Sequence, residues 1–251
     1  DLKNVEFIWV SDYVKDPEYW KKVMNVARNS TVKRIVRTGQ IMGRKEAEVL
    51  QASQILYPCM QCADIFQLKA DITQLGMDQR KVNVLAREIG SSIGFWKPIV
   101  VSHHMLMGLG EIPKTKDADR ILELKMSKSK PETAIFMNDS EEDIKRKIGK
   151  AYCHAKVIEE NPILEYSKYI IFEKFNTMEI TRPEKFGGDV VIENYAELEK
   201  LYREGKIHPA DLKTMVAHYI NQMLEPIRES FNKDQKLKKL LETIKRFEVT
   251  R

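Results

Sequence analysis

The chain has 251 residues, a length that fits one large domain or two modest ones. With 43% hydrophobic and 31% charged residues it has the composition of a soluble globular protein, and no apolar run approaches the roughly 20 residues of a membrane-spanning helix. The net charge of +5 is compatible with a polyanionic partner without identifying one. No signal-peptide pattern is present, so we expect a cytoplasmic location.

Strands alternate with helices in the first part of the chain. The run at residues 5–10 is β-branched and aromatic, which predicts a buried strand, and Asp16 followed by Pro17 predicts a helix start. The expected elements are, in order, a strand over 5–10, helices over 17–36, 46–56 and from 57, a strand over 71–75, a helix over 78–89 and a strand over 98–102. This alternation is typical of an α/β domain with a parallel sheet.

The helix from residue 57 carries a polar stripe. Tyr57, Gln61, Asp64 and Leu68 follow the spacing of one helix face, and Gln79 stands at the start of the next helix. A phenol, two amides and a carboxylate together suit a zwitterionic amino acid ligand. A solvated polar face is the alternative.

Cys59 and Cys62 form a C-x-x-C pair on the same helix. A zinc site would need two more ligands, and Cys153 and scattered histidines are the remaining candidates. We interpret the pair as packing residues and predict no metal site.

A lysine-rich string follows the strand at 98–102. Lys125-Met126-Ser127-Lys128-Ser129 continues into Lys130, and small hydroxyl side chains separate the ammonium groups. Lysines in such a loop suit nucleotidyl transfer, because they stabilise charge that develops on the α-phosphate and on pyrophosphate. A solvated lysine run is the alternative.

Helical patterns dominate after Pro131. Ser140 and Asp143 have capping-box spacing at the start of the first of these helices. The expected helices cover 140–152, 161–172, 195–204, 209–231 and 234–247. We therefore place a domain boundary near residue 138.

Taken together, these motifs resemble the archaeal and eukaryotic-type tyrosyl-tRNA synthetases, which are class I aminoacyl-tRNA synthetases. The resemblance covers nearly the whole chain and rests on the KMSKS string and on the segments at 57–64, 76–81, 182–188 and 208–212. It implies a Rossmann-like parallel-sheet catalytic domain over 1–138, with a dimer-contact insertion at about 17–56 and the KMSKS loop. An all-helical anticodon-binding domain over 139–251 would follow.

The resemblance also implies roles for single residues in the catalytic part. Tyr57, Gln61 and Gln79 would contact the α-amino group of tyrosine. Asp64 would accept a hydrogen bond from the phenol, and phenylalanine would leave this buried carboxylate unpaired. The catalytic residues would be those of the signature string, Lys125, Ser127 and Lys128, with both lysines neutralising pyrophosphate.

Further implied roles concern tRNA. Arg80 and Lys81 would lie near the first base pair of the acceptor stem, with ordinary surface charge as the alternative. Phe186 would stack on an anticodon base, Asp211 would bind the edge of that base, and His208 would support the turn. A helix N-cap is the alternative role for Asp211.

One family signature is absent, because no H-x-G-H string occurs in this sequence. We therefore expect a synthetase chain without its N-terminal portion, unable to activate tyrosine by itself.

The leading prediction is a tyrosine–tRNA ligase. It would use ATP with Mg²⁺ as co-substrate, need no tightly bound cofactor, act on tRNA(Tyr), and form a homodimer. The alternatives are a non-catalytic tRNA-binding fragment or paralogue, and tryptophan specificity, since a carboxylate also accepts from an indole N–H.

Overall fold

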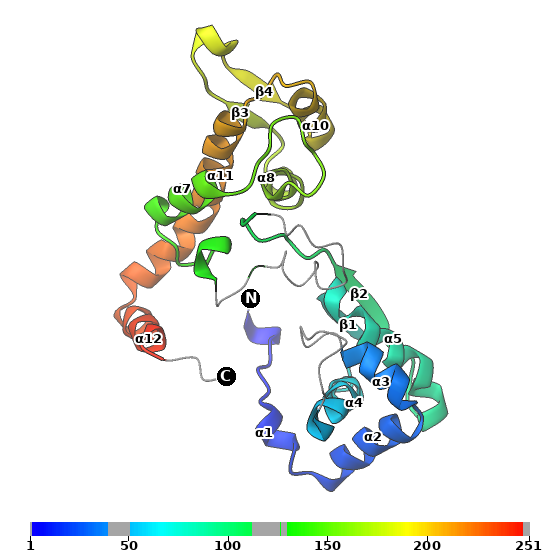
Figure 1. Ribbon diagram of the computed structural model, residues 1–251. Helices are drawn as coiled ribbons and strands as arrows, with labels where there is room; N and C mark the ends of the chain where they lie inside the picture. The colour runs from blue at the N-terminus through cyan, green and yellow to red at the C-terminus, as the bar shows by residue number, and fades with distance from the viewer. Residues whose placement is uncertain (1, 40–50, 112–125, 127–129, 248–251) are drawn as a thin grey trace. The chain divides into compact units, whose positions relative to one another are not determined.

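The computed structural model describes residues 2–39, 51–111, 126 and 130–247, and it consists of two compact units, Asp1–Met105 and Leu106–Arg251 (Figure 1). The domain boundary expected near residue 138 stays a prediction.

The first unit is an α/β structure. Its elements are α1 (Val10–Tyr13), α2 (Pro17–Arg28), α3 (Val32–Gly39), α4 (Ala52–Gln67), β1 (Ile72–Gly76), α5 (Arg80–Ile89) and β2 (Ile99–His103), with 3-10 turns at Leu2–Asn4, Met77–Gln79 and Gly90–Ile93. β1 and β2 pair in parallel from Ile72 opposite Ile99 to Gly76 opposite His103. Parallel neighbours need a crossover, and α5 supplies it and packs on both strands. The predicted fold class is confirmed.

The core of this unit lies between α4 and its neighbours α2, α3 and α5. Tyr19, Val23 and Val82 are fully buried there. Phe66 at the end of α4 stacks on Phe95 with ring centroids 4.8 Å apart. This packing holds α4, the helix of the polar stripe, from several sides.

Three expectations for this unit are wrong. Residues 5–9 form no strand, since no described strand pairs with them, and Phe7 and Trp9 are 82% and 75% exposed. The expected helix over 17–36 is two helices, α2 and α3. A helix does not begin at Tyr57 either, because α4 runs through Pro58, whose fixed φ suits a helix and whose ring is buried. Residues 46–50 lie outside the described part.

The second unit is mainly helical. Its elements are α7 (Glu141–Lys150), α8 (Pro162–Tyr166), a π-helical turn (Ser167–Ile171), α9 (Phe172–Lys174), β3 (Met178–Ile180), β4 (Val190–Ile192), α10 (Tyr195–Arg203), α11 (Pro209–Lys233) and α12 (Gln235–Lys245), with 3-10 turns at Pro131–Thr133 and Glu184–Phe186. The long helix α11 packs along α7 (Figure 1). Buried Ile144, Ile148, Leu212 and Val216 fill the space between them.

The expected helices of this unit are present. Ser140 caps α7, accepting from the backbone N–H of Asp143 at 3.1 Å. The description as all-helical needs one correction, because β3 and β4 pair antiparallel, with Met178 opposite Ile192. Strands of three residues are too short for an alternating pattern to show in the sequence.

Candidate functional site

A half-buried carboxylate, that of Asp64, lies at the centre of the polar stripe on α4. Oδ1 of Asp64 accepts hydrogen bonds from the hydroxyls of Tyr13 and Tyr19, at 2.9 and 2.8 Å. Tyr13 ends α1 and Tyr19 stands in the first turn of α2, so three helices meet at one oxygen atom. The sequence analysis missed both tyrosines, since no local spacing connects them to a residue 51 or 45 positions away.

The surroundings of this carboxylate favour neutral phenols as donors. Burial raises the pKa of Asp64, and the hydrogen bonds from Tyr19 and Tyr13 act in the opposite direction. Burial, with the bond to Asp64 next, raises the pKa of Tyr13 to about 12, and the same causes raise that of Tyr19. Both phenols therefore keep their protons at neutral pH.

Two predicted amide residues lie together beside it. Nε2 of Gln61 donates to Oε1 of Gln79 at 2.9 Å, and Nε2 of Gln79 donates to Asp78 at 3.0 Å. Oε1 of Gln61 is buried and has no hydrogen-bond partner among the described residues. An unpaired buried acceptor is unfavourable, so this oxygen suits a ligand donor such as an ammonium group.

Tyr57, the fourth residue predicted for the amino acid, stands one turn before Gln61 on α4 and is 50% exposed. Asp64 follows Gln61 by three residues, which places it on the same helix face about 4.5 Å further along the axis. The structure thus brings Gln61 and Gln79 into contact and sets Asp64 one turn away.

A basic hollow of about 230 Å³ opens between α3 and α5. Arg80 and Lys81 line it from the first turn of α5, and Arg34 and Arg37 line it from α3. Arg34 also pairs with Glu88. The sequence analysis named Arg80 and Lys81 but did not connect α3 with them. Cations from two helices around one hollow suit a phosphate group.

The residues predicted as catalytic, Lys125, Ser127 and Lys128, lie outside the described part of the chain. Met126 of the same string is half-buried against the core of the second unit, and its sulfur lies 3.6 Å from the Tyr166 hydroxyl. Lys130 is exposed.

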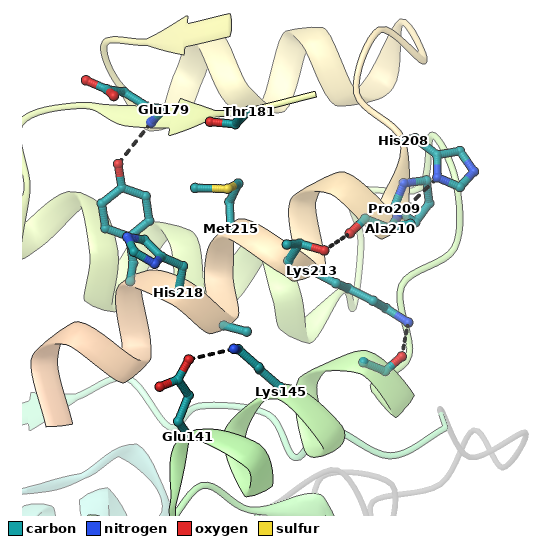
Figure 2. Close-up of a pocket in the computed structure, with 14 residues that line it drawn as sticks. Glu141, Lys145, Glu179, Thr181, His208, Pro209, Ala210, Lys213, Met215 and His218 are labelled. Atoms are coloured by element: carbon teal, nitrogen blue, oxygen red, sulfur yellow. Dashed lines mark hydrogen bonds and ion pairs between the residues drawn. The ribbon is translucent and has the colours of Figure 1, made fainter. Parts of the chain in front are cut away.

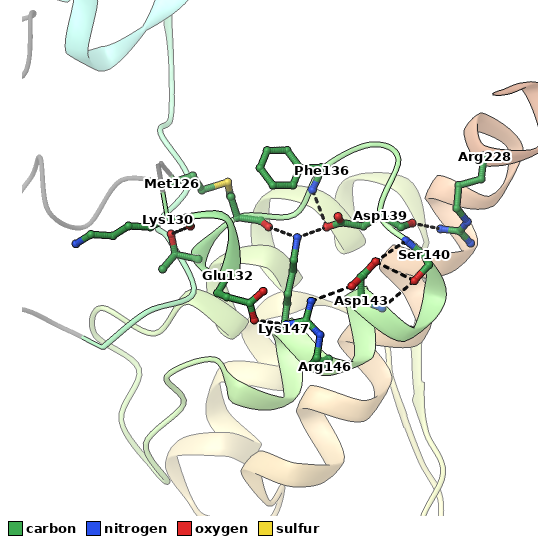
Figure 3. A network of polar contacts seen from close by, with 12 residues as sticks. Met126, Lys130, Glu132, Phe136, Asp139, Ser140, Asp143, Arg146, Lys147 and Arg228 are labelled. Atoms are coloured by element: carbon green, nitrogen blue, oxygen red, sulfur yellow. Dashed lines mark hydrogen bonds and ion pairs between the residues drawn. The ribbon is translucent and has the colours of Figure 1, made fainter. Parts of the chain in front are cut away.

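The segment that follows the string is fastened to α7 (Figure 3). The ammonium of Lys147 donates to Asp139 Oδ2 at 2.6 Å and to the carbonyl of Ala134 at 3.0 Å. Asp139 also accepts from the backbone N–H of Phe136, and its own carbonyl accepts from Arg228. Residues 134–139 therefore have a fixed conformation on the second unit.

Phe186, predicted to stack on an anticodon base, is 60% exposed in the 3-10 turn between β3 and β4. Arg182 holds this loop, donating from Nε to the Gly188 carbonyl and from Nη1 to the Lys206 carbonyl, each at 2.7 Å. The second bond ties the loop to the chain that leads into His208.

His208 is the N-cap of α11, with Nδ1 accepting from the backbone N–H of Ala210 at 3.2 Å. Asp211 is a first-turn residue of this helix, so the alternative of an N-cap role for Asp211 is wrong. Its carboxylate is thus not needed as the cap.

An open pocket of about 960 Å³ lies along α11 (Figure 2). His208 stands at one part of its wall and His218 at another, with the ion pair of Lys145 and Glu141 on α7. Lys213 reaches the Gly149 carbonyl at 3.0 Å. The pocket wall carries both positively and negatively charged side chains, so its charge does not indicate whether a ligand would be an anion or a cation.

The cysteine pair is buried in α4 as free thiols. Burial raises the pKa of Cys59 to about 11 and raises that of Cys62 as well. Both thiols are therefore protonated at neutral pH and pack in the core. Among the described residues, no group of three or more His, Cys, Asp or Glu side chains is arranged to hold a metal.

Comparison with known proteins defines the class. The model of the family described as "tRNA synthetases class I (W and Y)" matches residues 1–225. The chain belongs to this family of class I tRNA synthetases.

Individual relatives show which members of this family the chain is similar to. The chain is 50% identical to tyrosine–tRNA ligase 2, cytoplasmic, of Arabidopsis thaliana, over 99% of this chain and 32% of that protein. It is 45% identical to a tyrosine–tRNA ligase of Saccharolobus solfataricus, over 100% of this chain and 70% of that one. The crystal structure of tyrosyl-tRNA synthetase complexed with L-tyrosine from Pyrococcus horikoshii superposes with a TM-score of 0.87 at 39% identity, over 97% of this chain and 70% of the other.

The predicted resemblance to tyrosyl-tRNA synthetases of archaeal and eukaryotic type is thus confirmed. A tryptophanyl-tRNA synthetase from Aeropyrum pernix is 16% identical with a TM-score of 0.64, which shows the shared fold alone. The chain spans only 32% and 63% of the length of the two Arabidopsis relatives. Within the described residues, no helix is long and apolar enough to cross a membrane.

Proposed function

We propose that the protein is a tyrosine–tRNA ligase. It would join L-tyrosine to ATP, forming tyrosyl-adenylate and pyrophosphate, and then transfer the tyrosyl group to tRNA(Tyr). The observation that carries this proposal is the pair of acceptors on one face of α4. Asp64 can receive a phenol, and the unpaired Oε1 of Gln61 can receive an ammonium.

The selectivity for tyrosine would follow from the partial burial of Asp64. A phenol donates to the carboxylate, whereas the ring of phenylalanine would cover it with no donor and leave a charged acceptor desolvated. Gln61, Gln79 and Tyr57 would hold the amino end. An indole N–H is also a donor, so tryptophan is the competitor that the test must include.

In the activation step, the tyrosine carboxylate would attack the α-phosphorus of ATP while the bond to the leaving pyrophosphate breaks. Lys125 and Lys128, with Ser127 between them, would stabilise the charge on the phosphate oxygens. Mg²⁺ would accompany ATP. In the second step a hydroxyl at the 3′ end of the tRNA would attack the tyrosyl carbonyl and release AMP.

Two described surfaces support contact with tRNA. The hollow of Arg34, Arg37, Arg80 and Lys81 would hold acceptor-stem phosphates. The exposed ring of Phe186 would stack on an anticodon base, and Asp211 in the first turn of α11, supported by His208, would bind the edge of that base. The catalytic domain would cover residues 1–138 and the anticodon-binding domain 139–251. A cytoplasmic homodimer joined through residues 17–56 completes the proposal.

The first test compares binding of tyrosine, phenylalanine and tryptophan by calorimetry in the wild-type protein and in Asp64→Ala. We expect wild type to prefer tyrosine and Asp64→Ala to lose at least about tenfold of that preference, since a hydrogen bond to a charged group contributes about 1.5–3 kcal/mol.

Asp71→Ala is the matched control, because Asp71 is an exposed carboxylate of the same unit and should leave the preference unchanged. An unchanged preference in Asp64→Ala, or a wild-type preference for tryptophan, would contradict the proposal. Tyrosine-dependent ATP–pyrophosphate exchange then tests the reaction itself.

A further inference from the structure

The two oxygens of Asp64 have different surroundings. Oδ1 accepts from both Tyr13 and Tyr19, so each of its two lone-pair positions is used. Oδ2 accepts no hydrogen bond within the described part of the chain. Oδ1 therefore has two hydrogen-bond donors, whereas Oδ2 can still accept a donor from a ligand.

The two donors are themselves held firmly. Tyr19 is fully buried, and its ring meets that of Tyr13 edge-on at 5.0 Å and that of Trp20 at 5.9 Å. The indole of Trp20 donates to the Val14 carbonyl at 2.8 Å, which ties α2 to the turn after α1. Rings fixed in this way cannot turn their hydroxyls away without disturbing the start of α2.

We propose that Tyr13 and Tyr19 are positioning residues that hold Oδ1 of Asp64 and leave Oδ2 as the acceptor for the phenol of the ligand. The inference rests on the proposed function and names two residues that determine its specificity. Two donors on one oxygen fix the plane of the carboxylate, and therefore the direction from which a third donor approaches Oδ2. They also stabilise the ionised carboxylate against its burial.

The experiment measures calorimetric affinities for L-tyrosine and L-phenylalanine in the protein at its natural length. The variants are Tyr13→Phe, Tyr19→Phe and the double variant, each of which removes a hydroxyl and keeps the ring. We expect each single variant to lower the preference for tyrosine about tenfold, through weaker tyrosine binding, and the double variant to lower it further.

Tyr202→Phe is the matched control. Tyr202 lies in the second unit and is also fully buried. Its hydroxyl donates to the carbonyl of His154, in the same unit, at 2.9 Å. This variant also removes a tyrosine hydroxyl and its hydrogen bond, here to a neutral carbonyl, and should keep the full preference.

The pH dependence separates positioning from packing. Tyrosine binding should weaken as the pH falls and Asp64 takes up a proton. Without the two donors the pKa of Asp64 rises further, so the midpoint of this loss should move to higher pH in the double variant. A purely structural role of the hydroxyls would lower the melting temperature and leave the midpoint in place.

Each outcome is decisive. A wild-type protein without preference for tyrosine refutes the proposed function and the inference with it. If wild type prefers tyrosine and the double variant keeps both the preference and the midpoint, only the inference is overturned. Tighter tyrosine binding by Tyr13→Phe would also overturn it, because the Tyr13 hydroxyl would then compete with the ligand for Asp64.

Discussion

A buried ammonium group helps to anchor the loop before α7. Lys147 is 4% exposed, and it satisfies Asp139 and the Ala134 carbonyl while lying 4.7 Å from the centre of the Phe136 ring. A buried charge needs such partners, since desolvation otherwise outweighs any attraction. Lys147 therefore contributes to the order of residues 134–139, together with the bonds that Asp139 forms with Phe136 and Arg228.

Replacing Lys147 by Ala should leave Asp139 buried without its counter-charge. We expect a loss of about 3–5 kcal/mol in the free energy of unfolding, measured by urea denaturation. Lys145→Ala is the control two residues earlier on the same helix, where an exposed pair with Glu141 should matter little. Equal effects of the two variants would contradict the assignment of Lys147 as the anchor.

The raised pKa of Tyr13 predicts that the stability of the first unit changes at alkaline pH. Its pKa is about 12 in the folded protein and about 10 in an unfolded chain, so between these values the folded form binds more protons. Stability of the first unit should therefore fall as the pH rises from about 10 to 12. Thermal melting across this range should show a shallower fall in Tyr13→Phe, and an identical fall would count against the hydrogen bond to Asp64.

At the scale of elements, the loop between β3 and β4 depends on Arg182. Its three hydrogen bonds join Asp189, Gly188 and Lys206. Gly187 and Gly188 both have positive φ values, of 100° and 69°, which a side chain would strain. The loop is thus shaped by two glycines and closed by one guanidinium.

Arg182→Ala should loosen the loop that carries Phe186. Ordering even one residue on binding costs about 1–2 kcal/mol, so we expect tRNA(Tyr) affinity to fall about tenfold in filter-binding assays. The discrimination between native and altered anticodons should shrink as well. Arg203→Ala removes an exposed ion pair with Glu199 and is the control. If Arg182→Ala kept its anticodon discrimination unchanged, the loop between β3 and β4 would have no role in anticodon recognition.

Most elements could be predicted from local signals, and the failures have identifiable causes. Ser140 and Asp16 begin their helices as expected, because an N-cap acts within three residues. The apolar run at 5–9 failed as a strand because a strand depends on a partner that local sequence does not reveal. Pro58 failed as a helix start because α4 continues through it, although proline removes a backbone hydrogen bond from a helix interior. Its ring is buried in the core, and this packing is not visible in the local sequence.

The candidate site shows the same division. Gln61, Asp64 and Gln79 could be proposed from the sequence because helical spacing and motif resemblance are local. Tyr13 and Tyr19 reach Asp64, and the α3 arginines reach the basic hollow, from distant parts of the sequence. Only the packing of α2, α3 and α5 against α4 brings them there.

At the scale of the whole molecule, each of the two units has a hydrophobic core of its own. Val23 in α2 and Val216 in α11 are matched probes, as both are fully buried valines. We expect Val→Ala at either position to cost about 2 kcal/mol, from lost apolar burial and a small cavity. Calorimetry should show that each variant lowers a different thermal transition. A common shift of one transition would mean that the cores unfold together.

The aromatic cluster at Asp64 has a further consequence, which is optical. Trp20 lies against Tyr19, whose hydroxyl binds the carboxylate. Tyrosine excitation passes readily to a tryptophan at such short range, so we expect the emission of Trp20 to depend on the state of the phenol beside it. The protein thus has a tryptophan two contacts from the carboxylate, and the proposed binding of a ligand at Asp64 should change the fluorescence of this tryptophan without any attached dye.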